Sequence, residues 1–243
     1  MTDVGSVAGA AGRFGRYVGL AVATLALVLF ALLHVLVGWL SPVTDTISDY
    51  ALSTSGWMFN AAVLALAAAS LFLLGPLLRI QARVASGPSS AGAAASGPSP
   101  AGPAVSSWAS SLGAACFAAW CVGLVVLTVF PRDPVGAPIT VTGEIHKWAS
   151  VVALLSLPVG ALLVAVRHRS RGARVVAVVA AVCLVALVPF VSAYLADSPL
   201  RPFLGLLERG VALGEVVLLI LLGTIRLRRV AARTTDQRQG PPT

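Results

Sequence analysis

The sequence predicts an all-α fold: a polytopic integral membrane protein whose six transmembrane helices form one bundle, with both termini in the cytoplasm. Three observations support this prediction. Hydrophobic residues make up 58% of the 243-residue chain, charged residues make up only 11%, and the mean hydropathy is +0.92. The apolar residues are gathered in long runs, and the basic residues cluster in alternate connections between those runs.

The apolar runs decide between a soluble and a membrane-embedded fold. A soluble domain of this composition would expose large apolar patches and aggregate, whereas lipid is itself an apolar solvent. Each run is close to the about 20 residues that an α-helix needs to cross the hydrocarbon core. The sequence lacks the ten-residue alternation expected of membrane β-strands, so we expect helices.

The predicted elements follow one another along the chain. Residues 1–16 form a cytoplasmic tail, residues 17–225 form the transmembrane domain, and residues 226–243 form a basic cytoplasmic tail. Within the domain we expect spans at 17–40, 57–78, 107–130, 144–166, 175–195 and 203–225.

Residues 80–106 form the longest predicted connection, between the second and third spans. They are rich in Gly, Pro, Ser and Ala, and the triplet at 87–89 recurs at 97–99. Such a segment buries too little apolar surface to offset the entropy lost on ordering. We therefore predict a flexible linker, and we favour an inert insertion over a functional tether.

The arginines predict the orientation. Thirteen of the 17 basic residues lie in the two tails and in the connections after the second and fourth spans. By the positive-inside rule these segments face the cytoplasm. The opposite face keeps Arg132, Lys147, Arg201 and Arg209, together with most of the acids. The basic residues form no continuous patch with interleaved aromatics, so we expect membrane lipids as partners and no nucleic acid.

The three cysteines, Cys116, Cys121 and Cys183, fall inside apolar runs. Buried thiols of this kind pack as small hydrophobic groups, and the spacing of the first two does not match a zinc site.

Polar residues recur where the second, fourth and sixth spans begin. These three spans run in the same direction, so we expect Asp49, His146 and Glu208 to converge at the outer end of the bundle. Helix capping is the plainer interpretation of Asp49 and its neighbours, and a single interfacial histidine is often only amphipathic. The candidate polar cluster is Ser48, Asp49, Asn60, Glu144, His146, Ser150, Glu208 and Arg209.

Two ionisable residues fall inside predicted spans. Glu215 lies twelve residues beyond Phe203, which places it about 18 Å into the core, where an isolated charge is costly. His34 lies in the first span, and we expect Glu215 to be protonated or paired with it. For His34 alone, a hydrogen bond to a neighbouring helix is the simpler interpretation.

At these residues the chain resembles a family of six-span bacterial membrane proteins catalogued as domain of unknown function 998. The resemblance covers residues 17–225, the linker apart, and implies a six-helix bundle with a shared outer polar site in a bacterial plasma membrane. The first element is also similar, more distantly, to the Frag1/DRAM/Sfk1 membrane family. The matching residues are Ile47-Ser48-Asp49, Gly56, Phe59-Asn60, Phe130-Pro131, His146, Ser150, Gly205-Leu206 and Glu208-Arg209.

Three functions remain open. We favour a non-enzymatic membrane protein that binds or senses a lipid head group or small solute at the outer polar site. The first alternative is a metal-dependent membrane hydrolase that uses His146, Asp49 and Glu208, with zinc as cofactor; otherwise we predict no cofactor. Two histidines on separate spans are few ligands for zinc. The second alternative is a proton-coupled transporter that uses Glu215, although the sequence lacks an inverted repeat.

Overall fold

The computed structural model describes residues 4–85, 104–134, 136–166, 168, 170–195 and 198–224. Most of these residues are helical, and none of them lies in a strand. The helices are α1 (Val4–Leu36), α2 (Gly56–Ala85), α3 (Ala104–Val129), α4 (Val141–Ala165), α5 (Arg171–Leu195) and α6 (Leu204–Thr224), with short 3₁₀ turns η1 (Ile47–Leu52) and η3 (Arg201–Phe203).

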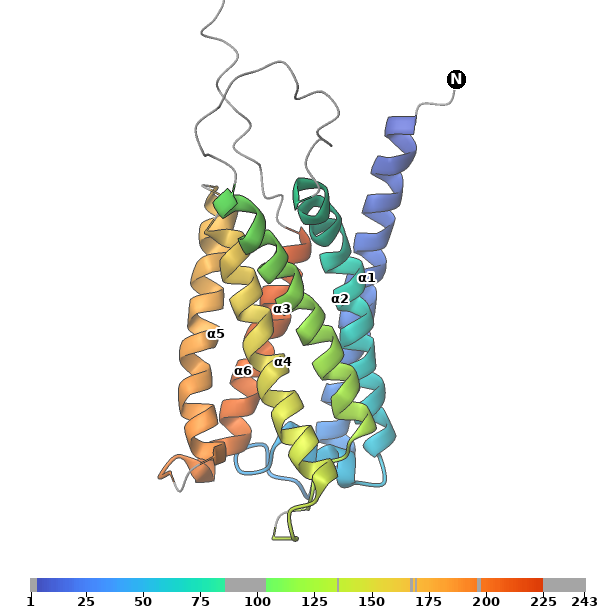
Figure 1. The fold of residues 1–243 in the computed structure, drawn as a ribbon. Coiled ribbons are helices and arrows are strands. Elements are labelled where there is room, and N and C mark those ends of the chain that lie inside the picture. The colour runs from blue at the N-terminus through green and yellow to red at the C-terminus, as the bar shows by residue number, and fades with distance from the viewer. Residues whose placement is uncertain are drawn as a thin grey trace, which may run out of the picture.

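The helices run side by side along one axis, and each packs against the next in an up-and-down bundle (Figure 1). The last helix, α6, contacts α1, α2 and α4 as well as its neighbour α5, so it closes the bundle. Its side chains Leu218, Leu219 and Leu222 are buried in the core. The end that holds residues 37–55, 130–134 and 198–203, at the bottom of Figure 1, is called the loop end below.

Within the described residues, five helices are long and apolar enough to cross a membrane: Gly12–Leu36, Gly56–Pro76, Ser111–Val129, Val141–Ala165 and Arg171–Tyr194. Their outward side chains are apolar, as Val182, Val185 and Val188 of α5 show. Such a surface suits lipid rather than water. The sixth helix is not among the five, because Glu208, Arg209 and Glu215 give its 21 residues too many ionisable groups.

The predicted boundaries need correction at several ends. The first helix begins at Val4, inside the predicted tail, and ends at Leu36. The helices α2 and α3 extend to Ala85 and from Ala104, so both ends of the predicted linker are helical. Its middle, residues 86–103, and the predicted tail 226–243 lie outside the described residues, as do Asp197 and the arginines that follow α6.

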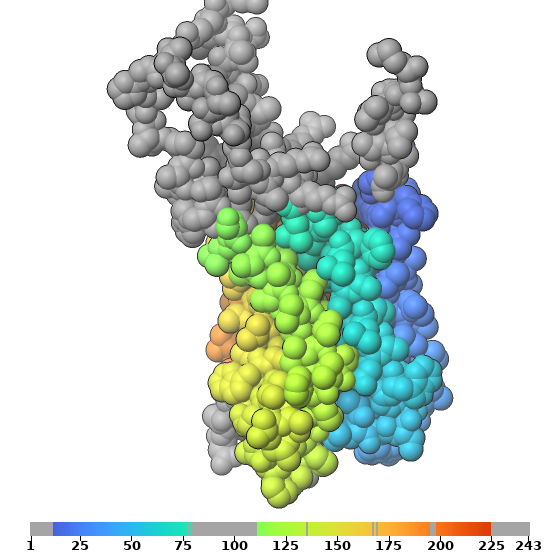
Figure 2. Space-filling model, turned by 45° about the vertical axis from the view of Figure 1, so that its right-hand side comes forward, coloured from blue at the N-terminus to red at the C-terminus, as the bar shows by residue number. Residues whose placement is uncertain are grey.

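Figure 2 views the face that α2, α3 and α4 form, with the connection between α3 and α4 as its lowest point. That connection is fastened to the start of α4. Thr140 caps the helix by accepting the Gly143 N–H at 3.1 Å, and Asp133 accepts the Thr140 N–H and hydroxyl at 2.9 and 2.7 Å. These two hydrogen bonds hold the pKa of Asp133 below its usual range, the backbone bond contributing most.

Two glycines allow backbone segments to meet at the loop end. A Cβ on Gly205 would lie 2.2 Å from the carbonyl oxygen of Asp45, and a Cβ on Gly56 would lie 2.2 Å from that of Ala51. Any side chain at either position would push the segment 41–55 away from the bundle. The start of α6 therefore lies directly against this segment, where the Leu206 N–H donates to the Val43 carbonyl at 3.1 Å.

Candidate functional site

A buried ion pair joins the first and third connections at the loop end. Asp49 is only 7% exposed, and its Oδ1 lies 2.8 Å from Nη1 of Arg132. Its Oδ2 accepts the N–H and the hydroxyl of Thr46, each at 2.7 Å. Arg132 also donates to the hydroxyls of Thr46 and Ser48. We call Thr46, Ser48, Asp49 and Arg132 the loop-end network; both oxygens of its carboxylate are partnered.

Three members of this network border a small pocket of about 280 Å³ at the same end. Tyr194 of α5 and Arg201 of η3 reach this pocket as well. The remaining residues that line it are Thr44, Asp45, Gly136, Ala193 and Leu204.

Arg209 forms a second buried cluster, between α6 and α1. Its Nε donates to Nε2 of His34 at 2.8 Å, and Nδ1 of His34 lies 2.7 Å from the Phe30 carbonyl oxygen. Because a carbonyl oxygen can only accept a hydrogen bond, Nδ1 of His34 carries the proton. Its Nε2 is then the acceptor for Arg209, as in a neutral imidazole. The other guanidinium nitrogens donate to the Asp45 carbonyl (2.7 Å), the Gly205 carbonyl (3.0 Å) and the Tyr50 hydroxyl (3.3 Å).

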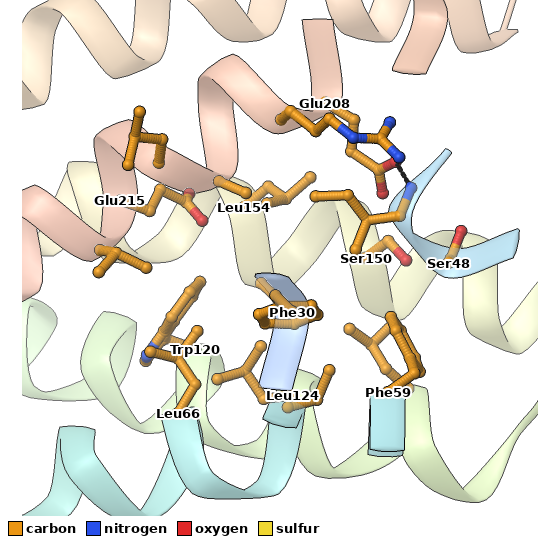
Figure 3. A pocket seen from close by; sticks show the side chains of 18 of the residues that line it. Phe30, Ser48, Phe59, Leu66, Trp120, Leu124, Ser150, Leu154, Glu208 and Glu215 are labelled. Carbon is orange, nitrogen blue, oxygen red and sulfur yellow. Dashed lines mark hydrogen bonds between the residues drawn. The ribbon is translucent and has the colours of Figure 1, made fainter. Parts of the chain in front are cut away.

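Between these clusters and the middle of the bundle lies a cavity of about 200 Å³, called the central cavity here (Figure 3). Its wall is mainly apolar and comes from α1, α2, α3, α4 and α6. Its polar lining residues are Ser48, His146, Ser150, Glu208, Arg209 and Glu215. In Figure 3, Ser48, Ser150 and Glu208 lie toward one end, where Glu208 accepts the Ile47 N–H, and Glu215 lies toward the other.

Two atoms of this lining have no hydrogen-bond partner among the described residues: Nε2 of His146 and Oε1 of Glu215. Both residues are only 1% exposed. Nδ1 of His146 lies 2.8 Å from the Phe130 carbonyl oxygen and therefore carries the proton, which leaves Nε2 as an acceptor. Buried polar groups are rarely left unpaired, so these two groups need an explanation.

The structure brings most of the predicted site residues to one region but divides them. Ser48, His146, Ser150, Glu208, Arg209 and Glu215 line the central cavity. Asp49 belongs to the loop-end network. Of the two alternatives for Glu215, protonation or pairing with His34, the pairing is not seen, because His34 bonds the Phe30 carbonyl and Arg209. The simpler interpretation of His34, a hydrogen bond to a neighbouring helix, is the one that the structure shows.

Two predicted members lie elsewhere. Glu144 pairs with Lys147 and accepts the indole N–H of Trp148 at 3.2 Å, beside a groove on the surface of α3 and α4. Asn60 is half-buried in α2 and does not line the central cavity.

Three residues that organise the site were not among the predicted site residues: Thr46, Tyr50 and Arg132. Arg132 was placed among the few outer cations, next to an outer face rich in acids, and that contrast was the signal for an ion pair. Tyr50 is fully buried, packs its ring 5.0 Å from that of His34, and directly follows the predicted acidic residue. Thr46 had no comparable signal.

Within the described part of the chain, no three His, Cys, Asp or Glu residues lie close enough together to hold a metal ion. The imidazole of His146 and the carboxylate of Asp49 each bond protein groups instead. The central cavity, with apolar walls and a few polar groups, has the character of a pocket for a small molecule. In such pockets the walls contact the hydrocarbon part of a ligand and the polar groups fix its orientation.

One comparison identifies related sequences. The family described as "Protein of unknown function (DUF998)" matches residues 91–225, which is more than half of the chain. This range includes Phe130-Pro131, His146, Ser150 and Glu208-Arg209, but not the Ile47-Ser48-Asp49 element. Neither a curated protein nor a solved structure matches the chain. The more distant likeness to the Frag1/DRAM/Sfk1 family is not shown and stays a prediction.

Proposed function

The chain belongs to the DUF998 family, and we propose that it is a binding protein of the bacterial plasma membrane that holds a small amphipathic molecule in its central cavity. The ligand is a lipid head group with the first part of its chain, or a small solute of the same character. The observation that carries the proposal is the cavity's division into apolar walls and a few polar groups.

The size of the cavity supports a small ligand. Its volume of about 200 Å³ exceeds the about 150 Å³ of an engineered apolar cavity that binds benzene. Its walls include Leu27 of α1 and Leu213 of α6, which are 38% and 61% exposed on the surface of the bundle. An entry between α1 and α6 would let a ligand pass sideways from the bilayer without crossing the polar loop end.

The membrane arrangement that goes with this function has six spans, with α6 as the sixth and the loop end outside the cell. The placement of the polar networks at one end, away from the arginine-rich connections, supports that orientation.

Cysteine labelling tests the orientation. In a cysteine-free background, single cysteines at the exposed positions Thr54 and Ala137 are expected to react with an impermeant reagent on intact cells. Cysteines at Ser96 and Thr235 are expected to react only after lysis. Labelling at Ser96 from outside would contradict the six-span arrangement.

Filling the cavity tests the binding function. Ala212 of α6 lines the central cavity, so Ala212→Phe places a ring inside it. Native mass spectrometry of the wild-type protein is expected to show a bound lipid-like mass that Ala212→Phe removes. Val185→Phe is the matched control, because Val185 is 70% exposed on α5 and does not line the cavity. A wild-type protein without any bound mass, or an equal mass in Ala212→Phe, would contradict the proposal.

A further inference from the structure

Glu215 is the buried acid for which the packing of the bundle gives no reason. Its side chain is 1% exposed, its Oε1 lacks a partner among the described residues, and its carboxyl group points into the central cavity (Figure 3). An ionised carboxylate in an apolar environment is costly unless a positive charge lies beside it. Without a positive charge beside it, Glu215 is therefore a neutral carboxylic acid.

Among the described residues that line the cavity, none places a free cation beside this acid. On α6, Arg209 donates four hydrogen bonds, to His34, Tyr50 and two backbone carbonyls. Glu208, also on α6, accepts the Ile47 N–H, and His146 on α4 presents only its acceptor nitrogen. On α5, the Cys183 thiol packs against Gly214.

The side chains that α1, α2 and α3 contribute to the cavity wall are apolar or aromatic, so none of them carries a charge. The positive charge that Glu215 can pair with must then come from a ligand.

The aromatic part of the wall suits such a ligand. Trp120 lies across the cavity from Glu215 in Figure 3, and its indole N–H is already donated to the Ser70 hydroxyl at 2.9 Å. Phe30 and Phe59 pack edge to face, with ring centroids 6.2 Å apart. Aromatic rings attract organic cations through their negatively charged faces, most strongly where water is excluded. A bare metal ion would find too few oxygen ligands among these side chains.

We propose that the central cavity binds a small lipophilic ammonium ion, with Glu215 as its counter-ion and the aromatic side chains around its substituents. This inference rests on the proposed binding function and names its ligand class. On binding, the O–H bond of the Glu215 carboxyl breaks, the proton leaves to solvent, and the carboxylate pairs with the ammonium. No electrons are transferred, and the net charge of the cavity is unchanged.

The test compares two probes of equal shape. Benzyltrimethylammonium carries the positive charge, and its neutral counterpart has carbon in place of nitrogen. Purified wild-type protein in detergent is expected to bind the cation at least tenfold more tightly than the neutral probe, measured from the rise in melting temperature with probe concentration. Equal affinity for the two probes would overturn the inference and leave the binding function standing.

Two variants test whether Glu215 is responsible for the preference for the cation. Glu215→Gln is expected to weaken cation binding at least tenfold while it leaves the neutral probe's affinity unchanged. Glu144→Gln, which removes an acid on the outer surface of α4, is the matched control and is expected to change neither affinity. An unchanged cation affinity in Glu215→Gln would overturn the role of Glu215.

Calorimetry in two buffers of different ionisation enthalpy measures how many protons are released when the cation binds. About one proton is expected to be released per cation bound by the wild-type protein. No release from the wild-type protein would overturn the exchange. If neither probe binds but Ala212→Phe still removes a bound mass, only the ammonium assignment fails. If neither probe binds and Ala212→Phe has no effect, the binding function fails with it.

Discussion

The loop-end network and the central cavity both contain buried ionisable side chains, but they differ in whether those side chains have hydrogen-bond partners. At the loop end, the Asp49 carboxylate has a partner on each oxygen, and one of those partners is a guanidinium. In the cavity, Glu215 and His146 are buried more completely, yet each keeps an atom without a partner in the described structure.

This difference separates residues that hold the fold from residues that are free to act. Removing a buried polar group whose hydrogen bonds are all made strongly destabilises the protein, because its partners are left buried and unsatisfied. A buried polar group without partners already destabilises the folded state, so its presence points to a function such as ligand binding. Neutralising the buried acid or its cation should therefore destabilise the protein at the loop end but not in the cavity.

The largest effect is expected from breaking the buried ion pair. Arg132→Ala leaves Asp49 buried without its cation and is expected to lower the free energy of unfolding by about 3 kcal/mol. Removing the acid as well, in Arg132→Ala with Asp49→Ala, is expected to recover part of this loss. Unfolding by SDS titration, followed by helicity, measures both variants.

The control for this ion pair is Lys147→Ala, because the pair of Lys147 with Glu144 is more exposed, and surface pairs contribute about 0–1 kcal/mol. Equal losses in Arg132→Ala and Lys147→Ala would mean that the loop-end network contributes no more than a surface pair.

The next effect concerns the Arg209 cluster. Arg209→Lys keeps the charge but replaces the fixed fork of five donors by three donors on a flexible stem. Of the four acceptors around Arg209, His34 Nε2 is the one that Arg209 contacts through Nε, a donor position that lysine lacks, so we expect this bond to be lost. A loss of about 1–3 kcal/mol in the free energy of unfolding is expected. His34→Ala in the Arg209→Lys background should then cost less than in the wild type, since their contact is already broken.

In the cavity, neutralising the buried acid is not expected to lower the free energy of unfolding. Glu215→Gln removes the ionisable group and keeps the shape, so we expect the free energy of unfolding to stay within about 0.5 kcal/mol of the wild type or to rise. Glu215→Lys adds a long side chain whose charge has no acid partner, and it is expected to prevent accumulation of folded protein. A loss of stability in Glu215→Gln as large as that in Arg132→Ala would remove the distinction between the two regions.

Five of the six predicted spans coincide with helices long and apolar enough to cross a membrane, and the ends of the helices were predicted less well. The apolar runs of α2 to α5 are long and obvious, since lipid accepts no other kind of surface. The start of α1 at Val4 was missed because small residues can continue a helix beyond the hydrocarbon without any apolar signal. In α6 the ionisable residues weaken the apolar signal, yet they are also the residues that mark the site.

Several residues that line the candidate site could be named from the sequence, but their pairing could not. The depth of Glu215 and the recurrence of polar groups at three helix starts selected residues that line the central cavity. Which acid meets which cation depends on the rotation of each helix and on the path of the segment 41–55, and neither follows from spacing along the chain. Depth made His34 one possible partner for Glu215, whereas the rotation of the helices brings it to Arg209.

The smallest effect is expected at Asp133, which tests whether burial or the number of hydrogen bonds decides the outcome. Like Asp49, Asp133 accepts two hydrogen bonds from one threonine, but residues 136–140, which follow it in the connection, are exposed to solvent. Asp133→Asn is expected to lower the melting temperature slightly at neutral pH, because the amide cannot accept from Thr140 with the strength of a carboxylate. Since these bonds lower the pKa of Asp133, their contribution is present above its usual pKa and lost as the pH falls through the lowered value. Melting temperatures of the two proteins should therefore converge in acid. A loss at neutral pH as large as that in Arg132→Ala would mean that the number of hydrogen bonds, and not burial, determines stability at the loop end.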